Sequence, residues 1–168
     1  VNGFVVSGMG GRKGDLCYPP RLEEELTELT GGYITNLNLR QSKYKQNIDS
    51  FFDDIRRILT IQGTALKHLM RSREWDFLFA VLSITDWMGH VLWKDIDPSH
   101  PLYDSKRSPV VTKRFRDCWR EIDDLIGELL ALVPAETSLM IVSDHGMGPL
   151  QSVFYPNRWL EEKGWLKR

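Results

Sequence analysis

A short apolar run that ends in an acid and an imidazole places the strongest constraint on this chain. Residues 139–142, Leu-Met-Ile-Val, form an unbroken run bounded by polar residues, as in a buried strand of a parallel sheet. Asp144, His145, Gly146 and Gly148 follow, and the glycines allow a sharp turn. Because open α/β sheets bind ligands at the carboxyl ends of their strands, this stretch is a candidate site. The alternative is that Asp144 only caps the strand end by binding nearby backbone.

A second apolar run repeats this arrangement earlier in the chain. Residues 77–84 are predicted to form another buried strand, and Asp86 and His90 follow it. If a helix begins here, the spacing of four places both side chains on one face, where they can chelate a divalent ion. Carboxylate oxygen and imidazole nitrogen suit zinc, with manganese or iron as alternatives. The two strand ends together predict a two-metal site on a parallel sheet, with Asp86, His90, Asp144 and His145 as its ligands.

The two motifs in this order resemble a known family. Thr-Asp-x-x-x-His at residues 85–90, followed by Ser-Asp-His-Gly at residues 143–146, resembles the alkaline phosphatase superfamily, in particular its type I phosphodiesterase and nucleotide pyrophosphatase branch. Residues 96–103 and 157–166 also resemble segments of that branch, so the resemblance runs along most of the chain. It implies an α/β fold, namely a partial alkaline-phosphatase-like parallel sheet flanked by helices, with a helical insertion. It also implies a metal-dependent phosphohydrolase acting on a small phosphate ester.

The resemblance further implies how the ligands divide between two metal ions, commonly zinc. Asp86 and His90 would bind one ion together with a later histidine. Asp144 and His145 would bind the other, together with an early aspartate and a nucleophilic Thr or Ser. Such a pair of ions lowers the pKa of the nucleophile, stabilises the leaving oxygen and neutralises the phosphoryl group. The nucleophile forms a covalent phospho-enzyme that water then resolves.

The sequence departs from this family pattern in three places. It shows no early strand that ends in an aspartate, no Thr or Ser nucleophile at a helix start there, and no histidine after His145. Thr85 and Ser143 match the flanks of the motifs, not the nucleophile. We therefore expect a fragment that carries part of a two-metal site, with the catalytic Thr or Ser outside this chain. The fragment is expected to bind metal weakly and to turn over no substrate alone.

The chain is expected to have two parts: an insertion or cap-like segment with long helices at residues 1–74, and a partial metal-binding α/β catalytic core at residues 75–168. Apolar side chains recur at helical spacing in several stretches, and together with capping signals they predict helices at residues 21–30, 42–73, 109–133 and 157–163. Gly63 is expected to break the second of these. Residues 1–20 are expected to be an irregular loop, and residues 33–39 a short strand. Strand, long helix and strand predict a right-handed parallel βαβ unit.

Composition and net charge limit the kinds of partner that we expect for this chain. The net charge is −1, so nothing favours a nucleic-acid polymer or an anionic membrane, and no apolar run reaches the roughly 20 residues of a membrane span. Cys17 and Cys118 are far apart, which suits a reducing compartment and leads us to expect a cytoplasmic location. A half sheet has open edges, so a homodimer that pairs those edges is a further expectation.

Other functions remain open on the sequence. A phosphomutase or phosphotransferase of the same superfamily would share these motifs, and a non-catalytic interaction module could retain a remnant of the metal site. His68 lies in a helical pattern and His100 in a proline-rich loop, and neither is expected to be a ligand. Trp87, Trp93 and Tyr103 near the first site are candidates to stack on a base or a lipid head group, although aromatic side chains at this density are more commonly part of a core.

Overall fold

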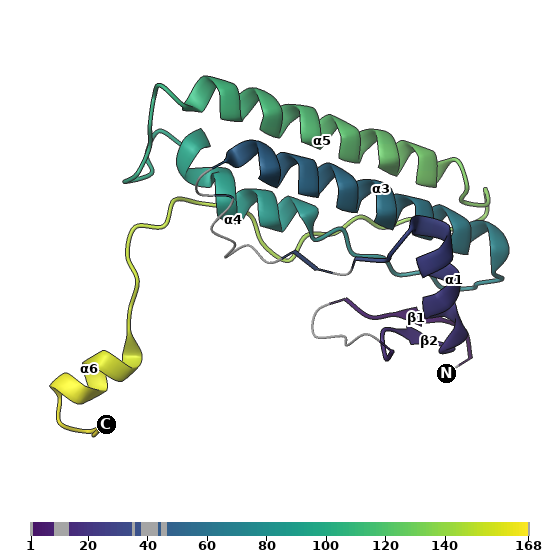
Figure 1. Cartoon of the computed structure of the whole chain (residues 1–168), viewed down its shortest axis with the longest axis horizontal. Helices are drawn as coiled ribbons and strands as arrows, with labels where there is room; N and C mark the ends of the chain where they lie inside the picture. Colours follow the sequence, from purple (N-terminus) through teal and green to yellow (C-terminus); the bar gives the residue numbers. More distant parts are fainter. Residues whose placement is uncertain (1, 9–13, 35, 38–43, 45–46, 168) are drawn as a thin grey trace.

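The computed structural model describes residues 2–8, 14–34, 36–37, 44 and 47–167. These residues form five helices and one two-stranded sheet (Figure 1). The elements in chain order are β1 (Val5–Val6), β2 (Cys17–Tyr18), α1 (Arg21–Thr30), α3 (Ile48–Ser72), α4 (Ile84–Ile96), α5 (Ser108–Leu130) and α6 (Pro156–Glu162).

The body of the molecule is built on α3, α4 and α5, which run roughly alongside one another (Figure 1). The first turn of α3 is capped by Asn47, whose side-chain oxygen accepts a hydrogen bond of 2.9 Å from the backbone N–H of Asp49. Helical spacing then places a row of apolar side chains on one face, all buried: Phe51, Phe52, Ile55, Ile58 and Leu59. Burying each such side chain stabilises the fold by about 1.5–3 kcal/mol. The predicted helix over residues 42–73 is thereby confirmed from residue 48; residues 42, 43, 45 and 46 lie outside the described residues.

Gly63 does not break α3, so that prediction was wrong. The helix runs unbroken from Ile48 to Ser72, and Gly63 is buried within it. A Cβ atom at this position would stand 2.8 Å from Cδ1 of Leu125 on α5. Gly63 therefore allows the two longest helices to approach closely, which a sequence pattern cannot distinguish from a helix break.

A smaller cluster joins α1 to the far end of α3. Leu22 and Leu26 of α1 pack on Ala65 and Leu69 of α3. The predicted end of α1 is confirmed, because Gly31 follows it in the left-handed conformation with φ 70°.

Residues 1–20 differ from the predicted irregular loop. Val5 and Val6 of β1 pair antiparallel with Tyr18 and Cys17 of β2, giving a short hairpin beside α1. The valines and the Cys-Tyr pair favour extended backbone. For the short strand expected at residues 33–39, positions 35, 38 and 39 lie outside the described residues, and the others are in no strand.

The prediction of a parallel sheet is corrected here, because neither of the two apolar runs forms a strand. Residues 77–83 and 139–142 belong to no strand, so the described residues contain no βαβ unit. Most of their large apolar side chains are exposed, with Phe77 at 82% and Met140 at 83%, while Leu78 and Leu82 are partly buried. An extended segment becomes a sheet strand only when a neighbour satisfies its N–H and C=O groups. No described segment pairs with either run, so only the sequence pattern of a buried strand is present.

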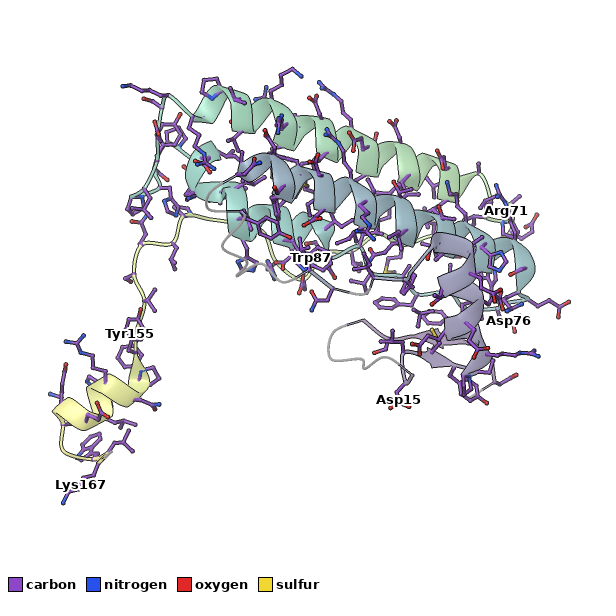
Figure 2. The ribbon with its side chains drawn as sticks, viewed as in Figure 1. Asp15, Arg71, Asp76, Trp87, Tyr155 and Lys167 are labelled. Atoms are coloured by element: carbon purple, nitrogen blue, oxygen red, sulfur yellow. The ribbon has the colours of Figure 1, made fainter. Side chains whose placement is uncertain are left out.

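The last helix, α6, lies apart from the helical body, and Tyr155 at its start marks the separation (Figure 2). Gly164 ends it with φ 73°, and the ring of Trp165 meets that of Trp159 edge-on at 5.4 Å. The helix predicted at residues 157–163 is confirmed, with bounds one residue earlier at each end. Throughout the described residues, each helix is too short or too polar to traverse a bilayer.

The main core crosses the expected boundary at residue 74. Phe51 and Ile55 of α3 share one cluster with Met88 and Leu92 of α4 and Ile122 of α5. The two parts of the chain are therefore packed together around α3, α4 and α5. This places α4, which carries the first candidate motif, against a rigid support.

Candidate metal centre

Helix α4 brings Asp86 and His90 together. The helix begins at Ile84, so Asp86 lies in its first turn and His90 one turn later. Nε2 of His90 stands 3.3 Å from Oδ1 of Asp86. The prediction that a helix starts here and places both side chains on one face is confirmed. A carboxylate in the first turn is also favoured by the helix dipole.

The opposite face of α4 anchors it in the core. Trp87, labelled in Figure 2, is only 7% exposed and belongs to the main cluster, as does Met88. Trp93 donates a hydrogen bond of 3.1 Å from its indole nitrogen to Asp97. The burial of Trp87 favours the core role of that ring over stacking on a substrate.

The second motif lies against the first. After α5 the chain runs back along the helices past α4 before it leaves toward α6 (Figure 1). On this return His145 places Nε2 at 3.7 Å from Oδ1 of Asp86 and at 3.8 Å from Oδ2 of Asp144. The four residues proposed from sequence therefore form one connected group, in which Asp86 contacts both imidazoles.

Local hydrogen bonds fix the orientation of His145. Its Nδ1 lies 2.8 Å from the carbonyl oxygen of Gly146, which can only accept, so Nδ1 carries the hydrogen. In the neutral ring, Nε2 then presents its lone pair toward Asp86. A metal-binding histidine is commonly held by such a backbone carbonyl. Ser143 and Asp144 stabilise the turn further: the Ser143 hydroxyl donates to the His145 carbonyl at 2.7 Å, and Asp144 accepts from the His145 N–H at 3.1 Å.

The same contacts raise the pKa of His145 above its ordinary value. The hydrogen bond to Gly146 is the largest cause, and the negative charge of Asp144 is the second. Partial desolvation opposes them, and Asp86 adds a smaller upward effect. The environment of the ring therefore favours a positive charge at this position, whether a proton or a metal ion supplies it.

One oxygen of Asp86 has no hydrogen-bond partner although it is buried. Oδ1 is shielded from solvent and accepts no hydrogen bond, even with two imidazole nitrogens at 3.3 and 3.7 Å. A buried carboxylate oxygen without a donor is costly. Two ligands that are each about 2.1 Å from a tetrahedral zinc ion stand about 3.4 Å apart. The observed spacing and the mixed oxygen and nitrogen donors thus fit a cation between them.

The four side chains nonetheless contact one another only in pairs and do not surround a single point. Among the described residues, no three His, Cys, Asp or Glu side chains surround one point closely enough to hold a metal ion. Asp144 is the most open member, with its side chain 90% exposed. The assignment of Asp86, His90, Asp144 and His145 as metal ligands therefore stays a prediction.

The remaining candidate residues lie elsewhere or bond locally. His68 is 2.6 Å from Glu25, and the Nδ1 atom of His100 accepts a hydrogen bond of 3.0 Å from the N–H of Leu102. The Thr85 hydroxyl donates a hydrogen bond of 3.4 Å to the carbonyl of Leu82, three residues earlier in the chain.

A residue that sequence reasoning missed is Met147, whose side chain packs directly on Gly89 of α4. The only signal in the sequence was a glycine inside an otherwise good helix, next to His90. This contact lies on the same side of α4 as Asp86 and His90, because Gly89 is three residues after Asp86.

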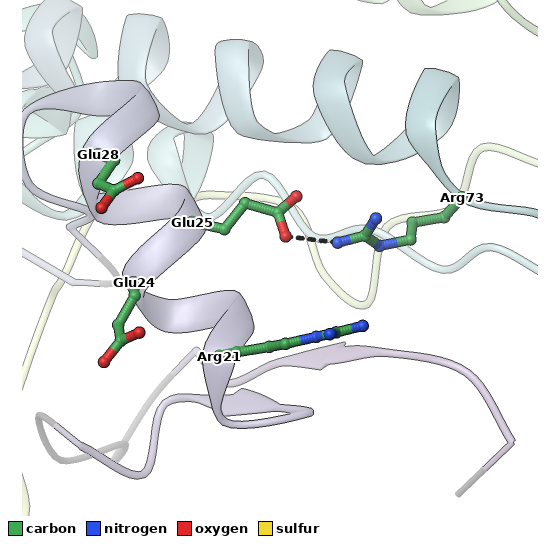
Figure 3. A pocket seen from close by; sticks show the side chains of 5 residues that line it. All are labelled: Arg21, Glu24, Glu25, Glu28 and Arg73. Carbon is green, nitrogen blue, oxygen red and sulfur yellow. Dashed lines mark hydrogen bonds and ion pairs between the residues drawn. The ribbon is translucent and has the colours of Figure 1, made fainter.

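An open cleft of about 360 Å³ lies beside α1, away from α4. It is lined by charged side chains, shown in Figure 3: Arg21, Glu24, Glu25, Glu28 and Arg73. Arg73 and Glu25 form an ion pair of 2.5 Å across it, so the cleft is part of the junction between α1 and α3.

Comparison with known proteins places the chain in a family. Neither the search of curated proteins nor the search of solved structures gave a match. The family model described as type I phosphodiesterase / nucleotide pyrophosphatase matches residues 11–168, which include both motifs. The chain therefore belongs to the type I phosphodiesterase and nucleotide pyrophosphatase family, a family of hydrolases that act on phosphate esters.

Proposed function

We propose that this chain carries part of the two-metal site of a phosphodiesterase or nucleotide pyrophosphatase. The observation that supports the proposal most strongly is the position of Asp86. Its buried Oδ1 accepts no hydrogen bond. The imidazole of His90, on the same helix, lies 3.3 Å from this oxygen, and that of His145, from a segment far along the chain, lies 3.7 Å from it. A ligand set for zinc, with manganese or iron as alternatives, is formed by a negatively charged carboxylate with an unsatisfied oxygen and by two ring nitrogens close to it.

In this proposal the residues divide their work by position. Asp86 and His90 hold the first cation from the rigid face of α4, while His145 and Asp144 hold the second from the turn beside it. Gly146 keeps the Nε2 lone pair of His145 available. When bound, the cations lower the pKa of the nucleophile and neutralise charge on the phosphoryl group.

The nucleophilic Thr or Ser is proposed to lie outside this chain. Thr85 and Ser143 are adjacent in sequence to Asp86 and Asp144, and both hydroxyls contact backbone carbonyls. On this basis the 168-residue chain is expected to bind metal weakly and to leave phosphate esters intact. The exposed runs at residues 77–83 and 139–142 are proposed to become strands of an alkaline-phosphatase-like sheet when partner strands are present.

Calorimetric titration of the chain with Zn²⁺ and Mn²⁺ tests the metal site. We expect binding that becomes at least tenfold weaker in Asp86→Asn and in Asp144→Asn. The matched control is Asp124→Asn, which removes the same charge from an exposed position on α5. Equal affinity in Asp86→Asn and in wild type would show that these residues do not form a metal site.

Hydrolysis assays test the division between this chain and the missing nucleophile. With either metal present, the chain is expected to release no p-nitrophenol from bis-p-nitrophenyl phosphate above the rate of the Asp86→Asn variant. Turnover that depends on Asp86 would place a working nucleophile within this chain and would refute that part of the proposal.

A further inference from the structure

Gly89 and Met147 pack together where the two halves of the candidate metal centre meet. Gly89 lies between Asp86 and His90 on α4, and it is buried. A Cβ atom built on it would stand 2.0 Å from Cε, 2.8 Å from Cγ and 3.1 Å from Sδ of Met147. The thioether therefore fills the space that any other residue at position 89 would need.

Met147 is also what holds the second motif against α4. Across residues 138–148, every side chain is exposed apart from that of Met147, which is partly buried. The other hydrogen bonds of the motif join Ser143, Asp144, His145 and Gly146 to one another and not to α4. Besides the 3.7 Å contact between His145 and Asp86, apolar packing of Met147 on Gly89 is thus a second described contact that holds the turn near α4.

Glycine in the interior of a helix lowers helix stability relative to alanine, so its presence in α4 calls for a compensating contact. Methionine suits such a contact because its unbranched, flexible side chain fills irregular space. Cε and Sδ could swing away from an added methyl group, but Cγ can move away only if Met147 changes its χ1 rotamer. A Cβ at position 89 would therefore force Met147 out of its place beside Gly89, and we expect the turn that carries His145 to shift with it.

We infer that Gly89 and Met147 are positioning residues that set the separation between the two pairs of metal ligands. This inference rests on the proposed function. Met147 seated on Gly89 places Nε2 of His145 near Oδ1 of Asp86, and the Gly146 carbonyl then sets the ring orientation. Neither Gly89 nor Met147 offers a metal ligand of its own.

NMR on the 168-residue chain with ¹³C-methyl methionine and ¹⁵N histidine tests this positioning without any metal. In wild type we expect a nuclear Overhauser effect between the Met147 methyl group and Gly89 Hα. In Gly89→Ala the Met147 methyl and His145 ring signals should both shift, and that contact should vanish. Gly127→Ala is the matched control, since a Cβ there meets nothing within 4 Å. Met140→Ala, at an exposed methionine, is the control for Met147→Ala.

Zn²⁺ titration of the same variants measures the consequence. Gly89→Ala and Met147→Ala are expected to weaken binding at least tenfold, whereas Met147→Leu, which keeps an apolar side chain of similar volume, should restore most of the affinity. Gly127→Ala and Met140→Ala should bind as wild type does. Circular dichroism of each variant shows whether the total helix content stays that of wild type.

The outcomes separate the two proposals. Wild-type signals for Met147 and His145 in Gly89→Ala would overturn the positioning role, whatever the metal affinity. If Gly89→Ala shifts both signals and no variant, wild type included, binds Zn²⁺, the packing of the two motifs stands and the proposed metal function fails. Both proposals are supported if Gly89→Ala shifts both signals and loses Zn²⁺ affinity. Met147→Leu should then bind Zn²⁺ nearly as wild type does, whereas Met147→Ala should not.

Discussion

At the scale of single residues, the centre depends on one carboxylate oxygen. Oδ1 of Asp86 is buried, accepts no hydrogen bond and has two imidazole nitrogens nearby. The spacing of four between Asp86 and His90 fixes the first contact, because residues one helical turn apart always adjoin. The second contact, to His145, depends on where the turn after residue 142 lies against α4.

The two cysteines differ in burial, and we expect them to differ in reactivity for that reason. Cys118 is fully buried in α5, and this burial raises its pKa to about 11, whereas Cys17 is only partly buried. At a pH of about 8, only about one Cys118 molecule in a thousand is a thiolate. We expect a thiol reagent such as dithionitrobenzoate to modify Cys17 first and Cys118 only on unfolding. Mass spectrometry of partly labelled protein checks the order, and equal labelling rates would show that α5 is not packed as described.

An ion pair between a buried carboxylate and a partly exposed guanidinium ties the end of α4 to the start of α5. Oδ1 of Asp95, whose side chain is only 3% exposed, lies 3.1 Å from Nε of Arg107. Removing Arg107 leaves a buried carboxylate unpaired, so Arg107→Ala should lower the free energy of unfolding by about 3 kcal/mol. Arg120→Ala breaks an exposed pair with Asp117 and should cost less than about 1 kcal/mol. Urea denaturation of both variants measures the two costs, and equal values would contradict the prediction.

At the scale of elements, the helices form where the sequence predicts them, whereas the two apolar runs do not form the predicted strands. Helix α3 is determined by local spacing and its Asn47 cap, and α5 by local spacing and a proline in its first turn, since each helix satisfies its own backbone groups along its length. A strand satisfies its backbone only through another segment, so residues 77–83 carry the pattern of a strand without forming one here. Gly63 shows the converse case, in which the partner helix decides the role of a glycine.

The junction of α1 with α3 should depend on pH through Glu25. Its pKa is lowered from 4.5, first by the hydrogen bond with His68 and further by Arg73, against an opposing effect of desolvation. A lowered pKa in the folded state means that the contribution to stability is present above the unfolded pKa. That contribution is lost as the pH falls through the folded value.

We therefore expect Glu25→Gln to lower the free energy of unfolding by up to about 1 kcal/mol near neutral pH. The difference from wild type should shrink as the pH falls below about 4.5. Urea denaturation across this range measures it. Glu28→Gln, at an exposed position on the same helix, is the control and should show no such trend. A constant difference at all pH values would argue against an ionic junction.

At the scale of the whole molecule, the described body exposes unusually apolar segments. Residues 139–142 are all more than half exposed, as are Phe77, Phe79 and Val81. Exposed extended runs with free backbone groups tend to pair with further chains. The homodimer expected from sequence therefore remains a proposal that the surface of this structure supports.

Self-association should accordingly depend on these runs. We expect sedimentation velocity to show a concentration-dependent increase in mass for wild type, and Met140→Lys to reduce it strongly. Val110→Lys adds the same charge at an exposed site on α5 and should leave association unchanged. A monomer at all concentrations would refute the dimer proposal.

The sequence by itself determined the long helices, the one-turn spacing of Asp86 and His90, and the family. A helix forms its backbone hydrogen bonds within its own segment, and a motif is defined by the order of residues along the chain. Both can therefore be read from the sequence. Only the tertiary structure decided that His145 meets Asp86, that Met147 occupies the space beside Gly89, and that Gly63 admits Leu125. Those contacts join segments far apart in the chain, and whether they form depends on packing volume and backbone partners, which no local pattern of residues specifies.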